Sequence, residues 1–235
     1  MVIINGRVFT GNNVTIVNGR VISGDETSKP KQFDEWKVVD CSNVDKITID
    51  SSVCDVHVSA SNSSKAEARF YGGATIDGDV NFDVRVVNRE LMITLRLTGN
   101  CYSGNLILDV TIPQRTFKVI TAKSLSADIT LNAGVATDYL KVKTKSGDLE
   151  TNATVGNVSV STMSGDIDLY IDAVQDVSVE ASTMSGDVSA ELNNIGRINL
   201  STSSMSGDVR NRHRGNRGFT ADVDISTMSG DIKIR

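Results

Sequence analysis

Ser161–Tyr170 reads STMSGDIDLY, and the chain repeats this pattern in STMSGDVSAE (182–191), SSMSGDVRNR (203–212) and STMSGDIKIR (226–235). With a related KSGD segment upstream, the Ser-Gly-Asp glycines are spaced 18, 21, 21 and 23 residues apart. A catalytic motif is needed once, whereas a structural unit recurs along the chain. The spacing therefore predicts a repeat architecture with units, here called rungs, of about 20 residues.

Apolar residues occupy fixed positions around each methionine. The residue five positions before the methionine and the residue four positions after it are apolar in every rung, and polar residues lie between them. Each such set of equivalent residues is called a column. The members of the two columns are Leu140, Val158, Val179, Leu200 and Val223, and then Leu149, Ile167, Val188, Val209 and Ile232. This alternation has the period of a strand, so each rung is expected to hold two strands that meet at the Ser-Gly-Asp segment.

The Ser-Gly-Asp segment is expected to form a corner. Glycine allows the backbone angles of a sharp bend, and aspartate accepts hydrogen bonds from turn amides. The methionine is expected to lie beneath the corner as a stacked filler. The predicted corner residues are Gly147, Asp148, Gly165, Asp166, Gly186, Asp187, Gly207, Asp208, Gly230 and Asp231.

The composition favours an all-β fold. Val, Ile, Ser, Thr, Asn, Asp and Gly dominate, and this mixture suits many short strands with polar turns better than long helices. We predict a single-stranded β-solenoid, or β-helix, over residues 40–235, with regular rungs from about residue 117. Six strand-like runs lie between residues 40 and 120, and TGNCYSGN (98–105) is expected to be a hairpin loop.

Residues 1–25 are expected to form a separate small β arm, because Asn-Gly pairs at 5–6 and 18–19 are strong signals for tight turns. The arm could cap the first rung or contact another copy of the chain. A charged segment containing one of the two prolines follows, and residues 26–39 are expected to be a linker.

The TMSGDI-type corners, together with KITIDSSVCDVHVSAS (46–61), resemble the toast-rack, or putative-adhesin, family of bacterial β-solenoids. The resemblance covers residues 46–235. It implies the same coiled all-β fold and a biochemical function that is poorly defined for the family. Members are often exported or tethered to a membrane, so the resemblance leaves a cell-surface location open.

Charge and cysteine content narrow the classes of function. The net charge of −5 argues against general nucleic-acid binding. The three cysteines have neither zinc-site nor disulfide-framework spacing. No basic and apolar leader begins the chain, and no apolar run reaches the length of a membrane span. We therefore expect a cytoplasmic protein without cofactor or metal. Calcium on the aspartate column is the alternative to turn capping.

Motifs of enzymes are absent. The two histidines, His57 and His213, are far apart in the sequence, and no nucleophile elbow, zinc-protease motif or phosphate loop occurs. Carbohydrate-active chemistry on paired carboxylates needs no local motif and remains a minority alternative. Cys54 lies within a predicted strand pair and is expected to be a small buried residue and not a nucleophile.

The segment RNRHRGNRGF (210–219) interrupts the apolar columns. Its cationic residues could grip a phosphate or a carboxylate, or the segment could be a solvated loop that balances an acidic body. The candidate ligand-binding residues are Arg210, Arg212, His213, Arg214 and Arg217.

The chain ends one strand beyond the last corner, at SGDIKIR, and this final rung is expected to be open at its edge. An open edge invites strand pairing, which predicts a homo-oligomer. The function predicted from the sequence is a non-enzymatic scaffold that acts through self-assembly or an unknown protein partner. The alternative is a binding or sequestering protein for a small anionic ligand, held by the arginine segment.

Overall fold

The structure is a computed structural model that describes residues 2–4, 7–9, 15–17, 20–23, 30–215 and 218–235. Near the N-terminus, β1 (Val2–Ile4) pairs antiparallel with β2 (Arg7–Phe9), and β3 (Thr15–Val17) pairs antiparallel with β4 (Arg20–Ser23). The Asn-Gly turns predicted at 5–6 and 18–19 lie outside the described residues.

The remaining strands belong to one large mixed sheet, and the prediction of an all-β fold is confirmed, since no helix occurs in the described residues. These strands are β5 (Lys31–Asp40), β6 (Lys46–Ser51), β7 (Asp55–Ser61), β8 (Lys65–Val87), β9 (Glu90–Pro113), β10 (Thr116–Ser124), β11 (Ile129–Leu131), β12 (Ala136–Lys143), β13 (Leu149–Ser161), β14 (Ile167–Asp172), β15 (Val177–Ser185), β16 (Val188–Asn193), β17 (Ile195–Ser206), β18 (Val209–Asn211), β19 (Phe219–Ser229) and β20 (Ile232–Ile234).

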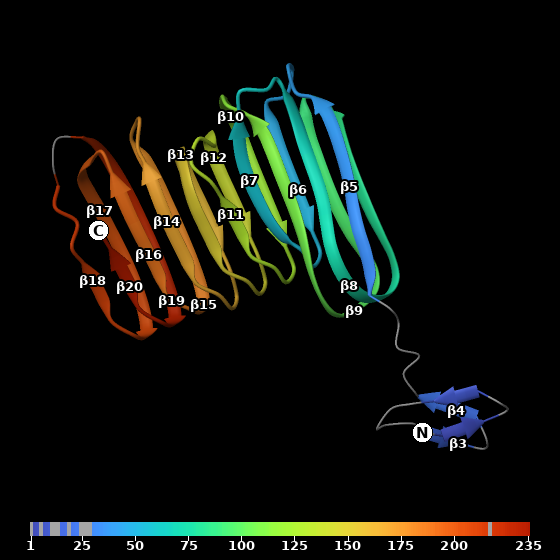
Figure 1. The fold of residues 1–235 in the computed structure, drawn as a ribbon. Helices are drawn as coiled ribbons and strands as arrows, with labels where there is room; N and C mark the ends of the chain where they lie inside the picture. Colours follow the sequence, from blue (N-terminus) through green and yellow to red (C-terminus); the bar gives the residue numbers. More distant parts are fainter. Residues whose placement is uncertain (1, 5–6, 10–14, 18–19, 24–29, 216–217) are drawn as a thin grey trace.

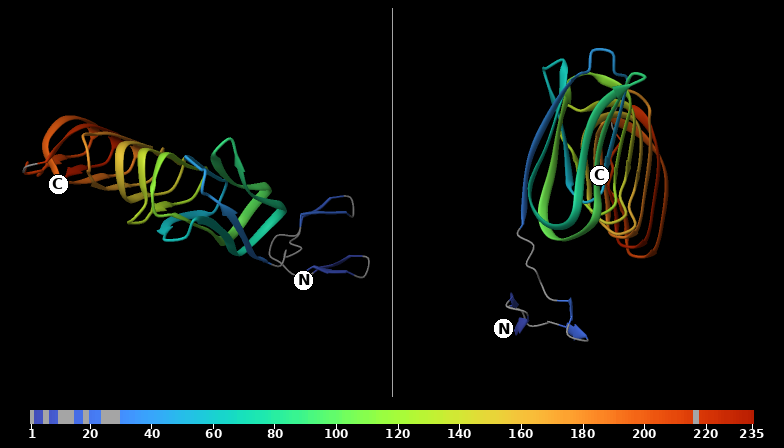
Figure 2. Two further views of the ribbon diagram at one scale, coloured as in Figure 1. Left: turned by 90° about the horizontal axis from the view of Figure 1, so that it is seen from above. Right: turned by 90° about the vertical axis from the view of Figure 1, so that its right-hand side faces the viewer.

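The sheet winds into a flattened coil with two faces (Figures 1 and 2). Apart from the antiparallel pairs β5–β8 and β8–β9, all pairings in this sheet are parallel. From β10 to β15 each segment on the first face pairs with the segment about one repeat further along the chain. The first face holds the strands that lead into the Ser-Gly-Asp corner, in the order β9, β6, β10, β12, β13, β15, β19, β17. The second face holds the strands that leave it, in the order β9, β7, β11, β13, β14, β16, β20, β18. β13 contributes to both faces.

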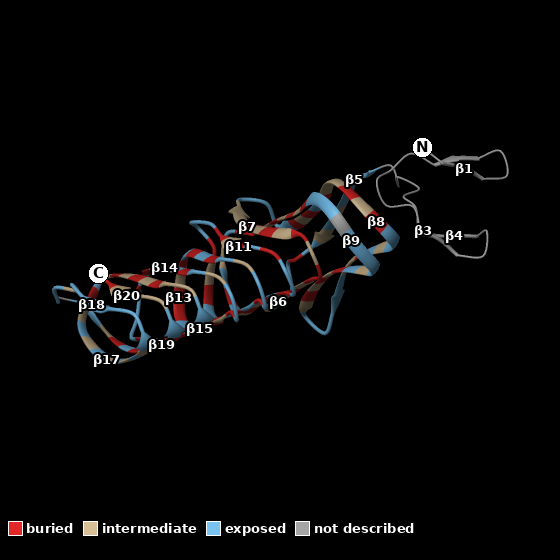
Figure 3. Ribbon diagram, turned by 90° about the horizontal axis from the view of Figure 1, so that it is seen from below, coloured by how far each residue is buried: buried red, intermediate tan, exposed pale blue. Residues whose placement is uncertain are grey.

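The core lies between the two faces, and buried residues alternate with more exposed ones along many of the strands (Figure 3). β14, for example, alternates fully between buried and exposed residues. Both predicted columns lie largely inside: Leu140, Val158, Val179 and Val223 are buried, as are Leu149, Ile167, Val188 and Ile232. At the end of the core nearest β5, the rings of Phe33, Phe70 and Phe82 pack against one another with centroids 5.1 and 6.0 Å apart. These aromatic side chains close that end of the core.

Two expectations for the N-terminal part are wrong. Residues 31–39 of the expected linker belong to strand β5, which pairs antiparallel with β8 from Lys31↔Ala74 to Asp40↔Lys65. The expected hairpin loop at 98–105 lies within β9. The hairpin between β8 and β9 turns at Asn88 and Arg89 instead, whose φ angles of 51° and 65° suit a two-residue turn.

The segment 98–105 looks like a loop because it is rich in glycine and asparagine, but it carries β9 around the edge of the coil. Residues 90–95 of β9 pair with β6 on the first face, and residues 107–113 pair with β7 on the second face. Gly99 has a φ of 111°, and a Cβ there would lie 1.8 Å from the carbonyl oxygen of Asp77. The glycine is therefore needed for a bend within a paired strand and not for a loop.

The last three rungs do not stack in the order of the chain. β19 lies between β15 and β17, and β20 lies between β16 and β18. Residues 219–234, here called the inserted rung, thus separate residues 177–193 from residues 195–211, here called the outer rung (Figure 1). The expectation of an open edge at SGDIKIR is wrong, because Ile232 and Ile234 are 0% exposed with strands on both sides. The outer rung forms the end of the coil.

Candidate functional site

The corner between the two faces depends on glycine. At Gly186, φ is 150°, and a Cβ would lie 2.1 Å from the carbonyl oxygen of Gly165 in the neighbouring rung. The backbones of successive corners therefore approach too closely for any side chain. The same relation holds at the other predicted corner glycines, with φ between 139° and 154°: Gly147, Gly165, Gly207 and Gly230.

The corner aspartates form a ladder along the coil. The carboxylate of Asp148 accepts a hydrogen bond from the backbone N–H of Asp166 at 2.8 Å, and Asp166 accepts one from Asp187 at 2.8 Å. Asp187 then accepts from Asp231, and Asp231 accepts from Asp208, in the spatial order of the rungs. Each of these hydrogen bonds joins two rungs. The aspartate column thus works as backbone caps, and no cluster of metal-ligating His, Cys, Asp and Glu occurs in the described part of the chain.

One carboxylate of the ladder has an additional cationic partner. The hydrogen bond from the Asp231 amide and the ammonium of Lys233, 3.2 Å away, hold the pKa of the Asp187 carboxyl below its usual value. The first cause is the backbone hydrogen bond, and the Lys233 contact adds to it. Asp187 is thus kept ionised where the inserted rung meets its neighbour.

The methionines of the motif point outward, and the expectation that they lie beneath the corner is wrong. The preceding residues, Thr162, Thr183 and Thr227, take the inward position and are 4–6% exposed. The hydroxyl of Thr227 donates to the carbonyl oxygen of Gly186 at 3.1 Å, and Thr183 donates likewise to Gly165. Because side chains alternate along a strand, the next residue must face solvent.

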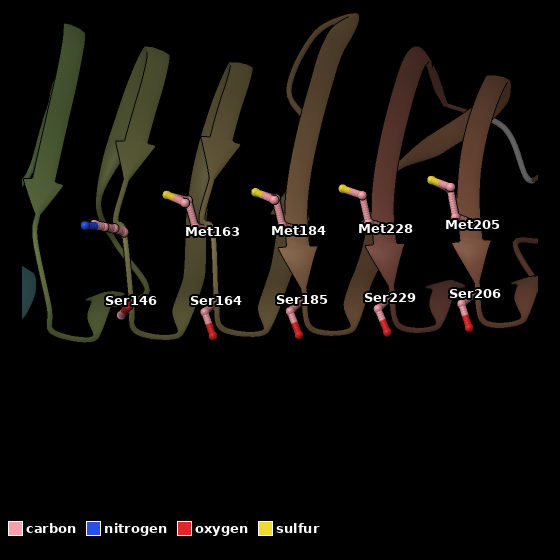
Figure 4. Close-up of a pocket in the computed structure, with 10 residues that line it drawn as sticks. Ser146, Met163, Ser164, Met184, Ser185, Met205, Ser206, Met228 and Ser229 are labelled. Atoms are coloured by element: carbon pink, nitrogen blue, oxygen red, sulfur yellow. The ribbon is translucent and has the colours of Figure 1, made fainter.

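Four methionines therefore form a straight exposed row, here called the methionine stripe (Figure 4). In spatial order it holds Met163, Met184, Met228 and Met205, with exposed fractions of 48, 48, 49 and 78%. Lys145 occupies the same position in the rung before Met163. The following serines pair in the same order, Ser164↔Ser185, Ser185↔Ser229 and Ser229↔Ser206.

The stripe and these serines line a shallow groove of about 600 Å³, and Lys145 and Ser146 complete its lining. Figure 4 shows the four thioethers extended side by side from equivalent positions. Aligned methionines at the surface form an adaptable apolar contact area of the kind found at binding surfaces. The repeated motif in the sequence marks the stripe, but the motif alone does not reveal that it is exposed.

The structure brings together only some of the cationic residues of the arginine segment. Arg210 and Arg212 line a pocket of about 130 Å³ with Lys233, Ile234 and Arg235. Arg214 does not line this pocket, and Arg217 lies outside the described residues. His213 is held by the backbone: its Nε2 lies 3.1 Å from the carbonyl oxygen of Ile195, and its Nδ1 lies 3.4 Å from that of Arg235.

Lys233 and Arg235 enter this pocket because the inserted rung lies beside β18, a pairing that chain order does not suggest. Arg210 stands directly beside Lys233 in the parallel pair of β18 and β20. Like charges at such positions repel each other. Arg210 contacts Asp208 at 2.9 Å and Lys233 contacts Asp187, which offsets part of that repulsion. The result is a cationic concave surface on the second face at the end of the coil.

A second polar cluster lies near the other end of the second face. Asp109 bridges His57 Nδ1, 3.1 Å away, and the hydroxyl of Tyr71, which donates to it at 3.0 Å. The hydrogen bond to Asp109 raises the pKa of the Tyr71 hydroxyl, and Asp109 also raises it by its charge. Cys54 is buried, which raises the pKa of its thiol to about 11 and keeps it protonated at neutral pH.

Comparisons with known proteins agree with this architecture. The family described as Toastrack DUF4097 matches residues 44–234. The chain belongs to this family. The resemblance drawn from the corner motifs is thereby confirmed, and the function of the family is unknown. No curated protein matches the chain.

Solved structures also resemble this toast-rack chain. A "putative cell adhesion protein" from Clostridium sporogenes has a TM-score of 0.58 and 13% sequence identity, over 87% of this chain and 99% of that chain. A "putative adhesin" from Bacteroides fragilis has a TM-score of 0.43 and 14% identity, over 88% of this chain and 99% of that chain. The first of these likenesses shows the shared fold. No helix among the described residues is long and apolar enough to cross a membrane.

Proposed function

We propose that the protein is a non-enzymatic β-solenoid scaffold that acts through protein–protein contact, by self-association of two copies along the methionine stripe. The observation that carries the proposal is the exposure of four aligned methionines on a hydrogen-bonded sheet. A rigid sheet keeps the spacing of these side chains fixed, so little conformational entropy of the backbone is lost on binding.

A second copy is the occupant that the spacing favours. Neighbouring rungs lie about 4.8 Å apart, so the methionine side chains of the stripe form a row with the same spacing. Another copy presents a row of the same period, so the two rows can pack against each other along their whole length. A twofold axis places the same patch on both partners, which is the commonest arrangement of soluble dimers.

The charge of Lys145 favours an antiparallel arrangement. Lys145 lies at one end of the stripe, next to Met163. An antiparallel second copy keeps the two lysines at opposite ends of the interface. A parallel arrangement would place these like charges together, which disfavours it.

Sedimentation equilibrium over a range of protein concentrations tests the proposal. The double variant Met184→Gln/Met228→Gln should weaken the dimer at least tenfold, because polar side chains would replace the centre of the stripe. The matched double variant with leucine at both positions keeps the apolar surface and should dimerise like the parent. A parent that stays monomeric at high concentration would overturn the self-association, and a different protein seated on the stripe would then be the partner to seek.

A second candidate function rests on the cationic pocket. Arg210, Arg212, Lys233 and Arg235 surround a space that fits a phosphate-sized anion, and guanidinium groups bind phosphate and carboxylate through paired hydrogen bonds. Calorimetric titration with pyrophosphate should show binding that Arg212→Gln weakens at least tenfold. Arg214→Gln is the control and should leave it unchanged. Equal binding by the parent and both variants would remove this candidate.

A further inference from the structure

The methionine stripe also presents four thioether sulfurs in a row, and a thioether is a soft, neutral metal ligand. We propose that neighbouring thioethers of the stripe bind a soft monovalent cation, Cu(I) or its analogue Ag(I), between adjacent rungs. This proposal concerns the same surface as the proposed self-association but does not depend on it.

The spacing of the rungs suits a cation held by two sulfurs. Equivalent atoms of stacked, equally oriented side chains repeat with the rungs, at about 4.8 Å. Figure 4 shows that the methionine side chains share one orientation. A metal–sulfur bond is about 2.3 Å long in zinc sites, and two bonds of that length in a line span about 4.6 Å. Small rotations of the side chains, with no backbone movement, are therefore enough to place a cation between two sulfurs.

The lining of the groove selects a soft ion. Besides the thioethers it contains serines and Lys145, and none of its residues carries a carboxylate, an imidazole or a thiol. The nearby carboxylates of Asp166 and Asp187 accept backbone hydrogen bonds. Calcium and magnesium require several oxygen ligands, and zinc prefers thiolate and imidazole. Thioethers favour Cu(I).

The positive charge of Lys145 opposes a cation at its own end of the stripe. The favoured positions are therefore the two intervals farthest from it, between Met184 and Met228 and between Met228 and Met205. These neighbours follow from the inserted rung. In chain order Met184 would adjoin Met205, but in the structure Met228 lies between them. Cation binding must follow the spatial order if the proposal is right.

Two variants with the same composition test this order. The first, Met163→Leu/Met205→Leu, retains the adjacent pair Met184 and Met228. The second, Met163→Leu/Met228→Leu, retains Met184 and Met205, which are separated by one rung. Both are made with Cys101→Ser, because the thiol of Cys101 is exposed and would itself bind a soft metal. Cys41 and Cys54 are buried and stay in place. Circular dichroism and thermal unfolding confirm that both variants fold.

Isothermal titration calorimetry with silver nitrate in a chloride-free buffer measures the affinity of each variant for Ag(I). The adjacent-pair variant should bind Ag(I) at least tenfold more tightly than the separated-pair variant. Equal affinities would overturn the proposal, and so would X-ray absorption of the silver-loaded parent that shows no sulfur ligand. Competition for Cu(I) with a chelator under anaerobic conditions should give the same ranking. Sedimentation without metal reports on self-association alone, so failure of one proposal leaves the other measurable.

Discussion

The inserted rung and the outer rung carry nearly the same corner motif, STMSGDI and SSMSGDV, yet they have different environments. In the inserted rung Ile225, Ile232 and Ile234 are fully buried. In the outer rung Met205 is 78% exposed and Val209 is 45% exposed. The motif therefore determines that a corner forms, and the place of the rung in the stack determines how much of it is buried.

The two rungs also differ at the positions that point inward. The inserted rung has Ile225 and Ile234 at positions where the outer rung has Thr202 and Asn211. A polar side chain at these positions costs little where one side of the rung faces solvent, but it is costly between two rungs. The polar residues of the outer rung thus fit an end position, and they also blunt an exposed strand edge.

Substitutions of the corner glycines are expected to show the largest difference between the two rungs in the free energy of unfolding. In Gly230→Val the new Cβ would lie 2.0 Å from the carbonyl oxygen of Gly186, at a φ of 151°, and would separate the inserted rung from the body. In Gly207→Val the clash is with Gly230, so only the outer rung separates. Urea unfolding should show a loss of about 4 kcal/mol or more for Gly230→Val and about 1–2 kcal/mol for Gly207→Val. Equal losses would contradict the order of the rungs.

A smaller contrast is expected from two apolar residues that stand side by side. Val209 pairs with Ile232 in neighbouring strands, and only Ile232 is buried. Ile232→Ala should lower the free energy of unfolding by about 2–5 kcal/mol because it leaves a cavity. Val209→Ala should change it by no more than about 0.5 kcal/mol. Thermal or urea unfolding followed by circular dichroism gives both values, and a costly Val209→Ala would show that the outer rung is covered in solution.

The smallest expected effect is a dependence on pH of the stability that Asp187 gives to the inserted rung. The carboxylate of Asp187 holds the inserted rung, and its pKa is lowered by the Asp231 amide and Lys233. A carboxylate with a lowered pKa stabilises the fold at every pH above its unfolded value, about 3.9, and this contribution is lost as the pH falls below that value toward the folded pKa. Asp187→Asn should therefore reduce stability at pH 6, and the difference from the parent should shrink below pH 4.

Unfolding curves at several pH values would measure this difference. The matched variant Asp166→Asn keeps the amide contact of the ladder at another corner but does not involve Lys233. A difference between Asp187→Asn and the parent that stays constant down to pH 2 would contradict the assigned cause.

Much of the rung could be predicted from the sequence, because its signals are local. Strand alternation, the corner glycine and the capping aspartate all act within a few residues of the motif or on the next rung. The outward direction of Met163 was missed because Thr162 was not recognised as the inward residue. Its hydroxyl donates to the carbonyl oxygen of Gly147 at 3.4 Å, so a polar residue could occupy the buried position.

The order of the rungs could not be predicted, because identical corners fit one another in any order. A signal is nevertheless present at Asn211, where a polar residue breaks an apolar column. A column that becomes polar in one rung and apolar again in the next indicates an end rung followed by an inserted one. The cationic pocket was missed in part for the same reason, since Lys233 and Arg235 join Arg210 only through the inserted rung.

The inserted rung has a consequence for how the chain folds during synthesis. Repeat proteins can grow by adding one unit at a time to the units already folded. Here β17 and β18 pair only with β19 and β20 among the described strands, although they are synthesised before them. When residue 211 leaves the ribosome, the native partners of its rung have not yet been made, and the edges of β15 and β16 are open. The outer rung can reach its native place only after residues 219–234 have been made.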